Sequence, residues 1–382
     1  MGIYRSPWLD EELDQWRESV RSFCEDTLAP NEGRFNAQGF VDRDVWRQAG
    51  EIGILGADIP ADLGGVGGHF GFSAIAAEEM ARVGANSFRV AVAIHVIAAH
   101  YLAHYGSDEQ RRQWLPGLCD GSKLAGVAMS EPGGGSDLQG MKTRAVLSDG
   151  QYAVSGSKIF ITNGSQADLL VVAAKTNPEA RARGISMMLL DTSLPGFSVG
   201  RRLEKVGLHA SDTCELFFDN CLVQADALLG KEEGLGFIQM MEQLAYERVI
   251  AAVGCVANME QAYVLARDYA AERRAFGKAL TEMQHVRFEL ADIKTDVLAA
   301  RTFLDHIITQ MISGSVDAEL ASMGKYWTSE KLGQVADRCV QIFGGYGYMT
   351  EYPVARLYAD ARVERIYGGT TEIMKEIISR TL

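Results

Sequence analysis

The sequence predicts an α+β multidomain protein with a helical N-terminal part (residues 1–123), a central antiparallel β part (124–230) and a helical C-terminal part (231–382). Apolar residues recur at helical spacing at both ends of the chain, whereas short β-like runs separated by turn signals fill the middle. The length of 382 residues suits two or three packed units, and a hydrophobic fraction of 47% supplies their cores.

The N-terminal part carries helix signals of three kinds: apolar residues three or four positions apart, a proline that ends a run, and a capping segment. In chain order, the expected elements are a helix over 10–27 ended by Pro30, a glycine-rich turn at 62–69, a long helix of small residues over 73–105, and a further helix capped by Ser107–Gln110.

The central part consists of short runs rich in β-branched and aliphatic residues, and Ser148–Gly150 is a hairpin signal between two of them. Helical spacing then returns and continues to the end of the chain. The clearest β runs are 127–129, 143–146, 152–154, 169–173, 185–190 and 216–218, and the long C-terminal helices are expected over 237–269, 283–312 and 317–344.

Charge and cysteine usage exclude several classes of protein. The 37 basic against 50 acidic residues leave a net charge of −13, which argues against binding to nucleic acid. No apolar run approaches the ~18 residues of a membrane span. Six scattered cysteines without a CxxC pair predict reduced thiols and no metal site, as in a bacterial cytoplasm or, less favoured, a mitochondrial matrix. The N-terminus shows no targeting signal, and the match of Met1–Ser6 to the loose myristoylation pattern is attributed to chance.

Several familiar catalytic signatures are absent or misleading. The sequence has no GxGxxG after a strand, no P-loop and no HExxH. Gly196–Gly200 matches GxSxG, but Ser198 lies inside the β part without the following helix that a nucleophile elbow needs. His95, His100 and His104 have no acidic neighbours, so we interpret them as packing residues.

Two segments of the central part could contact a ligand. Ser130–Asp137 is a glycine-rich loop closed by hydroxyl and carboxylate, and such loops let backbone N–H groups approach a ligand closely. Lys158–Gly164 places Phe160 and Thr162 on one strand face, where a flat ring beside a donor could brace a planar heterocycle. An ordinary loop and core packing remain alternatives for the two segments.

Two glycine-rich segments near the C-terminus could also contact a ligand. Gln341–Gly347 ends a helix with three glycines in four positions, and Arg365–Glu372 places paired glycines before a terminal helix. Paired glycines at the start of a helix suit close contact with polar groups of a ligand.

Taken in order, these motifs resemble the acyl-CoA dehydrogenase family of flavoenzymes. The resemblance implies an N-terminal helical domain, a central β-barrel-like domain and a C-terminal four-helix bundle. The matching segments are Met129–Asp137, Lys158–Asn163, Glu272–Gly277, Gln341–Gly345 and Ile366–Thr370, and they span nearly the whole chain.

The resemblance implies FAD as the cofactor, bound between the β part and the C-terminal helices and completed by a neighbouring subunit, in the family usually within a homotetramer. The implied flavin contacts are Val127, Met129, Ser130, Ser136, Phe160 and Thr162, followed at the end of the chain by Thr370 and Glu372. The residues implied for the ADP half are Arg273, Phe276, Gln284, Gln341 and Gly345.

The sequence departs from the commonest family pattern at the catalytic base. Many members carry Ile-Tyr-Glu-Gly-Thr, in which Glu is the base, and this chain has Gly368 there. The long-chain and isovaleryl branches place the base in a Glu-Arg pair on another helix, and this chain has Glu247 followed by Arg248. Apolar neighbours such as Leu244 and Ile250 raise the pKa of a carboxyl toward working pH, which suits a base.

The implied reaction is α,β-dehydrogenation of a medium-chain, long-chain or branched acyl-CoA to the trans-2-enoyl-CoA. Glu247 would remove the α-proton, and the backbone N–H of Gly368 would stabilise the charge on the thioester oxygen. The substrate contacts implied by the resemblance are Ser136, Tyr246, Arg248 and Gly369. An electron-transfer flavoprotein is the expected electron acceptor.

Two alternatives stay open at this point. The same chemistry could act on an acyl chain carried by a carrier protein. The chain could also be a catalytically silent flavin-binding protein with an assembly role, which Gly368 favours and Glu247 opposes.

Overall fold

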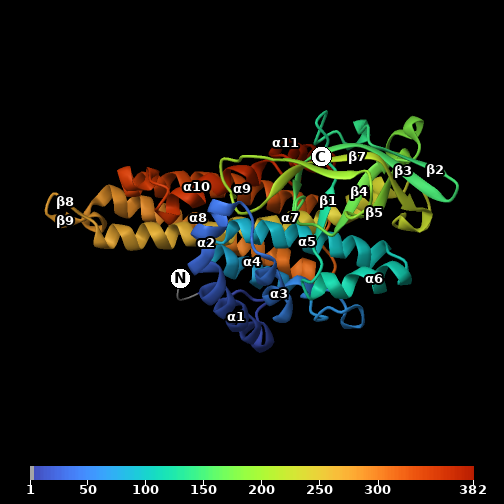
Figure 1. Ribbon diagram of the computed structural model, residues 1–382. Helices are drawn as coiled ribbons and strands as arrows, with labels where there is room; N and C mark the ends of the chain where they lie inside the picture. The colour runs from blue at the N-terminus through green and yellow to red at the C-terminus, as the bar shows by residue number, and fades with distance from the viewer. Residues whose placement is uncertain (1–3) are drawn as a thin grey trace.

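The computed structural model describes residues 4–382, so the Met1 and Gly2 positions of the Met1–Ser6 pattern lie outside the described residues. Its elements follow the expected order of helices, one β sheet and helices (Figure 1). The first helices are α1 (Glu11–Phe23), α2 (Glu32–Gln38), α3 (Arg43–Glu51), α4 (Phe70–Arg82), α5 (Asn86–Tyr105) and α6 (Asp108–Cys119). The sheet contains β1 (Ala125–Ala128), β2 (Arg144–Ser148), β3 (Gln151–Thr162), β4 (Leu169–Lys175), β5 (Ile185–Asp191), β6 (Phe197–Arg202) and β7 (Thr213–Gln224). The C-terminal elements are α7 (Gly236–Glu272), β8 (Arg274–Ala275), β9 (Lys278–Ala279), α8 (Gln284–Ile312), α9 (Ala318–Phe343), α10 (Pro353–Ala361) and α11 (Thr371–Ser379).

Two helix boundaries differ from expectation. The long helix expected over 73–105 is two helices, because Gly84 adopts a φ of +78° that a continuous helix does not allow. Pro30 does not end the first helix: the chain passes through a π-turn at Cys24–Leu28 and then carries Pro30 in the first turn of a short 3-10 segment. A first-turn position needs no backbone N–H donor, so proline is tolerated there.

The central strands form one mixed sheet rather than a purely antiparallel unit. Four strand pairs are antiparallel, but β1 and β4 run parallel, and β2 meets β4 through one parallel bridge. The predicted hairpin is confirmed: Asp149 and Gly150 join β2 and β3 with φ angles of 51° and 79°, as a type I′ turn requires. Ser198 lies on the exposed edge strand β6, which rules out a nucleophile elbow.

The sheet is buried against the helices on one side. Along β4, Val171 and Ala173 belong to the helical core, whereas Leu170 and Val172 belong to a second cluster inside the β part. This alternation follows from the two-residue period of a strand whose two faces are both covered.

Among residues 4–382, one helix, α7, is long and apolar enough to span a membrane by length and composition, contrary to the expectation that no apolar run approaches that limit. However, 78% of its most apolar window is buried inside the molecule. The apolar residues of α7 therefore pack against the neighbouring helices, above all α9 and α4.

Helix α5 connects the sheet to α7. On the sheet side, the Asn163 side-chain amide donates to the carbonyl of Ala91 at 2.9 Å and to that of Ala125 at 3.1 Å. His95 accepts from the N–H of Ala125, so it is a buried packing residue, as expected. These bonds hold the junction of β1 and β3 against α5.

Helices α5 and α7 run antiparallel along each other. The Asn258 side chain donates to Asn86 at 2.9 Å near the start of α5. Near its end, Gln243 lies 3.5 Å from the hydroxyl of Tyr105. The start of α5 therefore lies beside the middle of α7, and the end of α5 lies beside the beginning of α7.

Candidate active site

Glu247 projects from α7 as a half-buried carboxyl group. Its Oε1 is shielded from solvent and has no hydrogen-bond partner within residues 4–382. Burial raises the pKa of Glu247 to about 7, although the neighbouring Arg248 lowers it. A carboxyl that titrates near neutral pH and has an unpaired oxygen suits a general base.

Gly368 lies in a loop with room around it. Its φ is +62°, and a Cβ built at this position would meet nothing within 4 Å. The loop is held from behind, because the buried Lys325 donates to the carbonyl of Gly369 at 2.6 Å. The next residue, Thr370, caps α11 by accepting from the N–H of Ile373. The structure thus leaves space where the common family pattern has a glutamate side chain.

A buried ion pair precedes this loop. The guanidinium of Arg89 on α5 donates to Glu364 at 2.6 Å, and both side chains are almost fully buried. Arg89 passes over Gly254 of α7, where a Cβ would lie 1.9 Å from its Nη1. The pair ties α5 and α7 to the turn four residues before Gly368. Neither residue was predicted from the sequence, although a charged side chain inside the apolar 86–102 stretch is a usable signal.

On the β side, the segment after β1 is held by a second buried pair. Lys158 donates to the carbonyl of Met129 at 2.9 Å and to Glu131 at 3.0 Å. The N–H of Ile159 donates to the carbonyl of Ser130. These bonds fix Met129 and Ser130 beside β3. Lys158 and Glu131 were part of the quoted motifs, but their positioning role was not predicted.

Phe160 is presented by an irregularity in β3. The register of β3 against β7 shifts between Lys158 and Ile161, and Phe160 has a φ of +61° with 66% of its surface exposed. A left-handed backbone at a bulky residue costs free energy, and proteins retain such strain mainly at functional sites. An exposed ring held at a bulge is suited to pack on a flat ligand.

The residues present fit a flavin. The exposed ring of Phe160, the half-buried Thr162 next to it and the open loop at Gly368 leave apolar and polar surface unfilled. Val127, Met129 and Ser130 are likewise half-buried at the end of β1. Ser136 lies in the exposed glycine-rich loop, and Glu372 is exposed at the start of α11.

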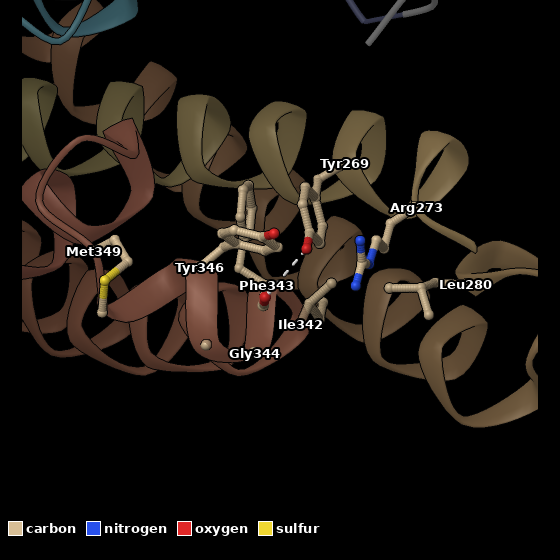
Figure 2. A pocket seen from close by; sticks show the side chains of 9 residues that line it. Tyr269, Arg273, Leu280, Ile342, Phe343, Gly344, Tyr346 and Met349 are labelled. Carbon is tan, nitrogen blue, oxygen red and sulfur yellow. Dashed lines mark hydrogen bonds between the residues drawn. The ribbon is translucent and has the colours of Figure 1, made fainter. Parts of the chain in front are cut away.

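The residues predicted for the ADP half gather at the opposite end of the molecule. Figure 1 shows the β8–β9 hairpin there, far from the sheet. Arg273 and Gly345 line a pocket of about 500 Å³, in which Tyr269 and Phe343 stack at 4.0 Å (Figure 2). Phe276, on the hairpin, is 95% exposed, and Gln284 and Gln341 are exposed on the adjoining helices.

This end of the molecule, which we call the tip, lies far from Glu247. Arg273 follows Glu247 by 26 residues along one continuous helix. At 1.5 Å per residue, this spacing is about 39 Å. The structure therefore separates the predicted cofactor residues into two groups, one on the β side and one at the tip.

Two predicted substrate residues have other contacts. The hydroxyl of Tyr246 donates to Asp58 at 2.9 Å, and its ring lies 4.2 Å from that of His100 inside the core. Arg248 is buried and donates to Ser322 of α9 at 3.3 Å. Both residues pack α7 against its neighbours. Within residues 4–382 no cluster of potential metal ligands is present.

Comparisons with known proteins agree along the whole chain. Three segments match the acyl-CoA dehydrogenase N-terminal domain (residues 10–122), middle domain (126–221) and C-terminal domain (234–382). The chain is 43% identical over 385 residues to the mitochondrial long-chain specific acyl-CoA dehydrogenase of Sus scrofa, with 100% of this chain and 88% of that protein covered.

Solved structures give the same result. The crystal structure of an acyl-CoA dehydrogenase from Geobacillus kaustophilus matches with a TM-score of 0.95 and 41% identity, covering 99% of each chain. That of an acyl-CoA dehydrogenase complexed with FAD from Bacillus anthracis matches with a TM-score of 0.92 and 30% identity, covering 99% of this chain and 68% of the other.

Proposed function

Because the chain belongs to the acyl-CoA dehydrogenase family of FAD-dependent oxidoreductases, we propose that it desaturates a medium-chain, long-chain or branched acyl-CoA and that Glu247 is the α-proton base. The observation that carries this proposal is the buried, unpaired Oε1 of Glu247 in a chain whose Gly368 cannot take a proton. FAD, when bound, accepts the β-hydrogen of the substrate as hydride.

Glu247 and Gly368 have different parts in the proposed reaction. Glu247 takes the α-proton on its carboxylate, and its raised pKa of about 7 suits a base that works near neutral pH. The N–H of Gly368 donates to the thioester oxygen as negative charge develops there. The missing side chain at Gly368 leaves room for the carboxyl that approaches from α7.

The cofactor-binding residues belong to two subunits in this proposal. Val127, Met129, Ser130, Ser136, Phe160, Thr162, Thr370 and Glu372 would hold the flavin of their own subunit. Arg273, Phe276, Gln284, Gln341 and Gly345 would hold the ADP half of a neighbour, which the distance of about 39 Å supports. A homotetramer with an electron-transfer flavoprotein as acceptor is the proposed assembly.

Substitution of Phe276 tests the shared cofactor site. Phe276→Ser removes an aromatic ring that is 95% exposed in the single chain, so the fold of the subunit should not change. We expect a smaller assembly and a lower FAD-to-protein ratio, measured by light scattering and absorbance. The matched control Val146→Ser removes another exposed apolar side chain, on β2, and should change neither. An unchanged assembly with full FAD in Phe276→Ser would contradict the proposed sharing.

Anaerobic titration tests the proposed substrate. The similarity to a long-chain enzyme and the small, buried Ala98 and Ala99 on α5 support an extended acyl pocket. We expect acyl-CoAs of at least medium length to bleach the visible flavin absorbance, and short ones to bleach it weakly. Bleaching only by acyl groups on a carrier protein would reassign the substrate, and no bleaching by any thioester would show a silent flavoprotein.

A further inference from the structure

Among the buried polar atoms without hydrogen-bond partners, one on α5 and one on α7 lie at facing turns of the two helices. The hydroxyl of Tyr101 has no hydrogen-bond partner within residues 4–382, and Tyr101 is completely buried. Oε1 of Glu247 is the other such atom. A buried hydroxyl that makes no hydrogen bond costs free energy, so its retention needs a reason.

The antiparallel register of α5 and α7 places these two atoms opposite each other. Tyr105 of α5 contacts Gln243 of α7, and the ring of His100 contacts that of Tyr246. Tyr101 lies one helical turn before Tyr105, and Glu247 lies one turn after Gln243, on the same faces of their helices. In an antiparallel pair these two turns meet.

The charges around Glu247 agree with this placement. The negative charge of Glu247 is among the causes, after burial, that raise the pKa of Tyr101 well above its ordinary value. The tyrosine hydroxyl therefore keeps its proton at every working pH and can only donate to a carboxylate. The charged and titratable groups nearby are Arg248 on α7, Tyr105 paired with Glu242, Lys325 of α9 beside Arg248, and the Asp58–His100 pair that holds Tyr246.

We propose that Tyr101 is a positioning residue for the base, donating a hydrogen bond to the Glu247 carboxylate through one bridging water molecule. This bond stabilises the ionised form of Glu247 and turns one carboxylate oxygen toward α5, which leaves the other oxygen to take the α-proton. The inference rests on the proposed role of Glu247 as base.

Tyr101→Phe tests the proposal, because it removes only the hydroxyl oxygen and keeps the buried ring. A hydrogen bond to a charged group is worth enough to move a pKa by about one unit. We therefore expect the acid limb of flavin reduction by acyl-CoA to move up by about one pH unit. Tyr105→Phe is the matched control: its hydroxyl donates to Glu242 one turn away, and its acid limb should not move.

A measurement without substrate gives an independent readout. Glu247 makes the free energy of unfolding of the holoenzyme fall as the pH rises toward its folded-state pKa. In Tyr101→Phe, the pH at which the free energy of unfolding stops falling should be higher by the same one unit. If Tyr101→Phe only stabilises the protein and neither pH profile moves, the Tyr101 hydroxyl makes no hydrogen bond to Glu247 and the proposal is wrong. If the wild type is reduced by no acyl-CoA, the proposed function fails, whereas the unfolding profile still tests the Tyr101–Glu247 bond.

Discussion

Glu247→Gln is expected to leave a yellow, folded flavoprotein that acyl-CoA no longer reduces. Glutamine has nearly the same shape as glutamate but cannot accept the α-proton, and Gly368 has no side chain that could take it instead. Loss of a general base reduces the rate by about 100-fold to roughly 10⁴-fold. Anaerobic stopped-flow absorbance measures the rate of flavin reduction directly. The matched control is Glu242→Gln, an exposed carboxylate on the same helix, which should keep the wild-type rate.

The pH profile of the wild type follows from the same group. Glu247 acts as a base only when ionised, and burial raises its pKa to about 7. The rate of flavin reduction should therefore rise with pH and level off above about pH 7. A rate already constant at pH 5 would mean that a carboxyl with an ordinary pKa removes the proton.

Stability should change in the opposite direction. In the unfolded chain Glu247 ionises near its ordinary pKa of 4.5, below its folded-state pKa of about 7. The folded state therefore binds more protons between these values, and the free energy of unfolding falls as the pH rises through this window. Glu247→Gln removes the buried charge, so the variant should be more stable than the wild type at pH 8, by about 3 kcal/mol at most, since each pKa unit is worth about 1.4 kcal/mol. The difference should vanish below pH 4.5, as urea unfolding of the holoenzyme at each pH can show.

Glu364→Ala is expected to cause the largest loss of stability. The change leaves the guanidinium of Arg89 buried without its carboxylate partner, and breaking a buried ion pair costs about 3–5 kcal/mol. The turn that leads to Gly368 also loses its anchor on α5, so the variant should bind FAD more weakly. Urea unfolding and the FAD-to-protein ratio measure the two effects.

The double variant Arg89→Met with Glu364→Leu separates the ion pair from simple packing. Removing both side chains leaves no unpaired charge, so the double variant should be more stable than Glu364→Ala. If Glu364→Ala costs less than about 1 kcal/mol, the pair does not anchor the loop.

The order of elements was predictable from the sequence because periodicity and turn chemistry are local. Asp149 and Gly150 specify a type I′ hairpin by themselves, and their positive φ angles confirm this turn. The parallel pairing of β1 with β4 was not predictable, because neither strand carries a signal for its partner. Helix α7 was placed correctly, but its burial depends on the surrounding helices.

Site residues that belong to a sequence motif were predictable. Residues whose role depends on contacts with other helices were not. Gly368 was identified because it replaces the glutamate of the common family motif, and Glu247 because it belongs to the alternative Glu-Arg pair. Tyr246, adjacent to Glu247 in sequence, points about 100° away around the helix and pairs with Asp58. Neither Arg89 nor Tyr101 belongs to a motif, because their partners come from other helices. The helix predicted over 237–269 already implies a long separation between the tip and Glu247, and the length of α7 agrees with it.

The most direct test of the account is exchange of the substrate's α-hydrogen with solvent. An acyl-CoA that lacks a β-hydrogen can lose its α-proton but cannot transfer hydride, so exchange in D₂O reports proton abstraction alone. We predict that the wild-type holoenzyme incorporates deuterium at the α-carbon with a rate that rises up to about pH 7, and that Glu247→Gln incorporates none. Incorporation by Glu247→Gln at the wild-type rate would contradict the assignment of Glu247 as the base.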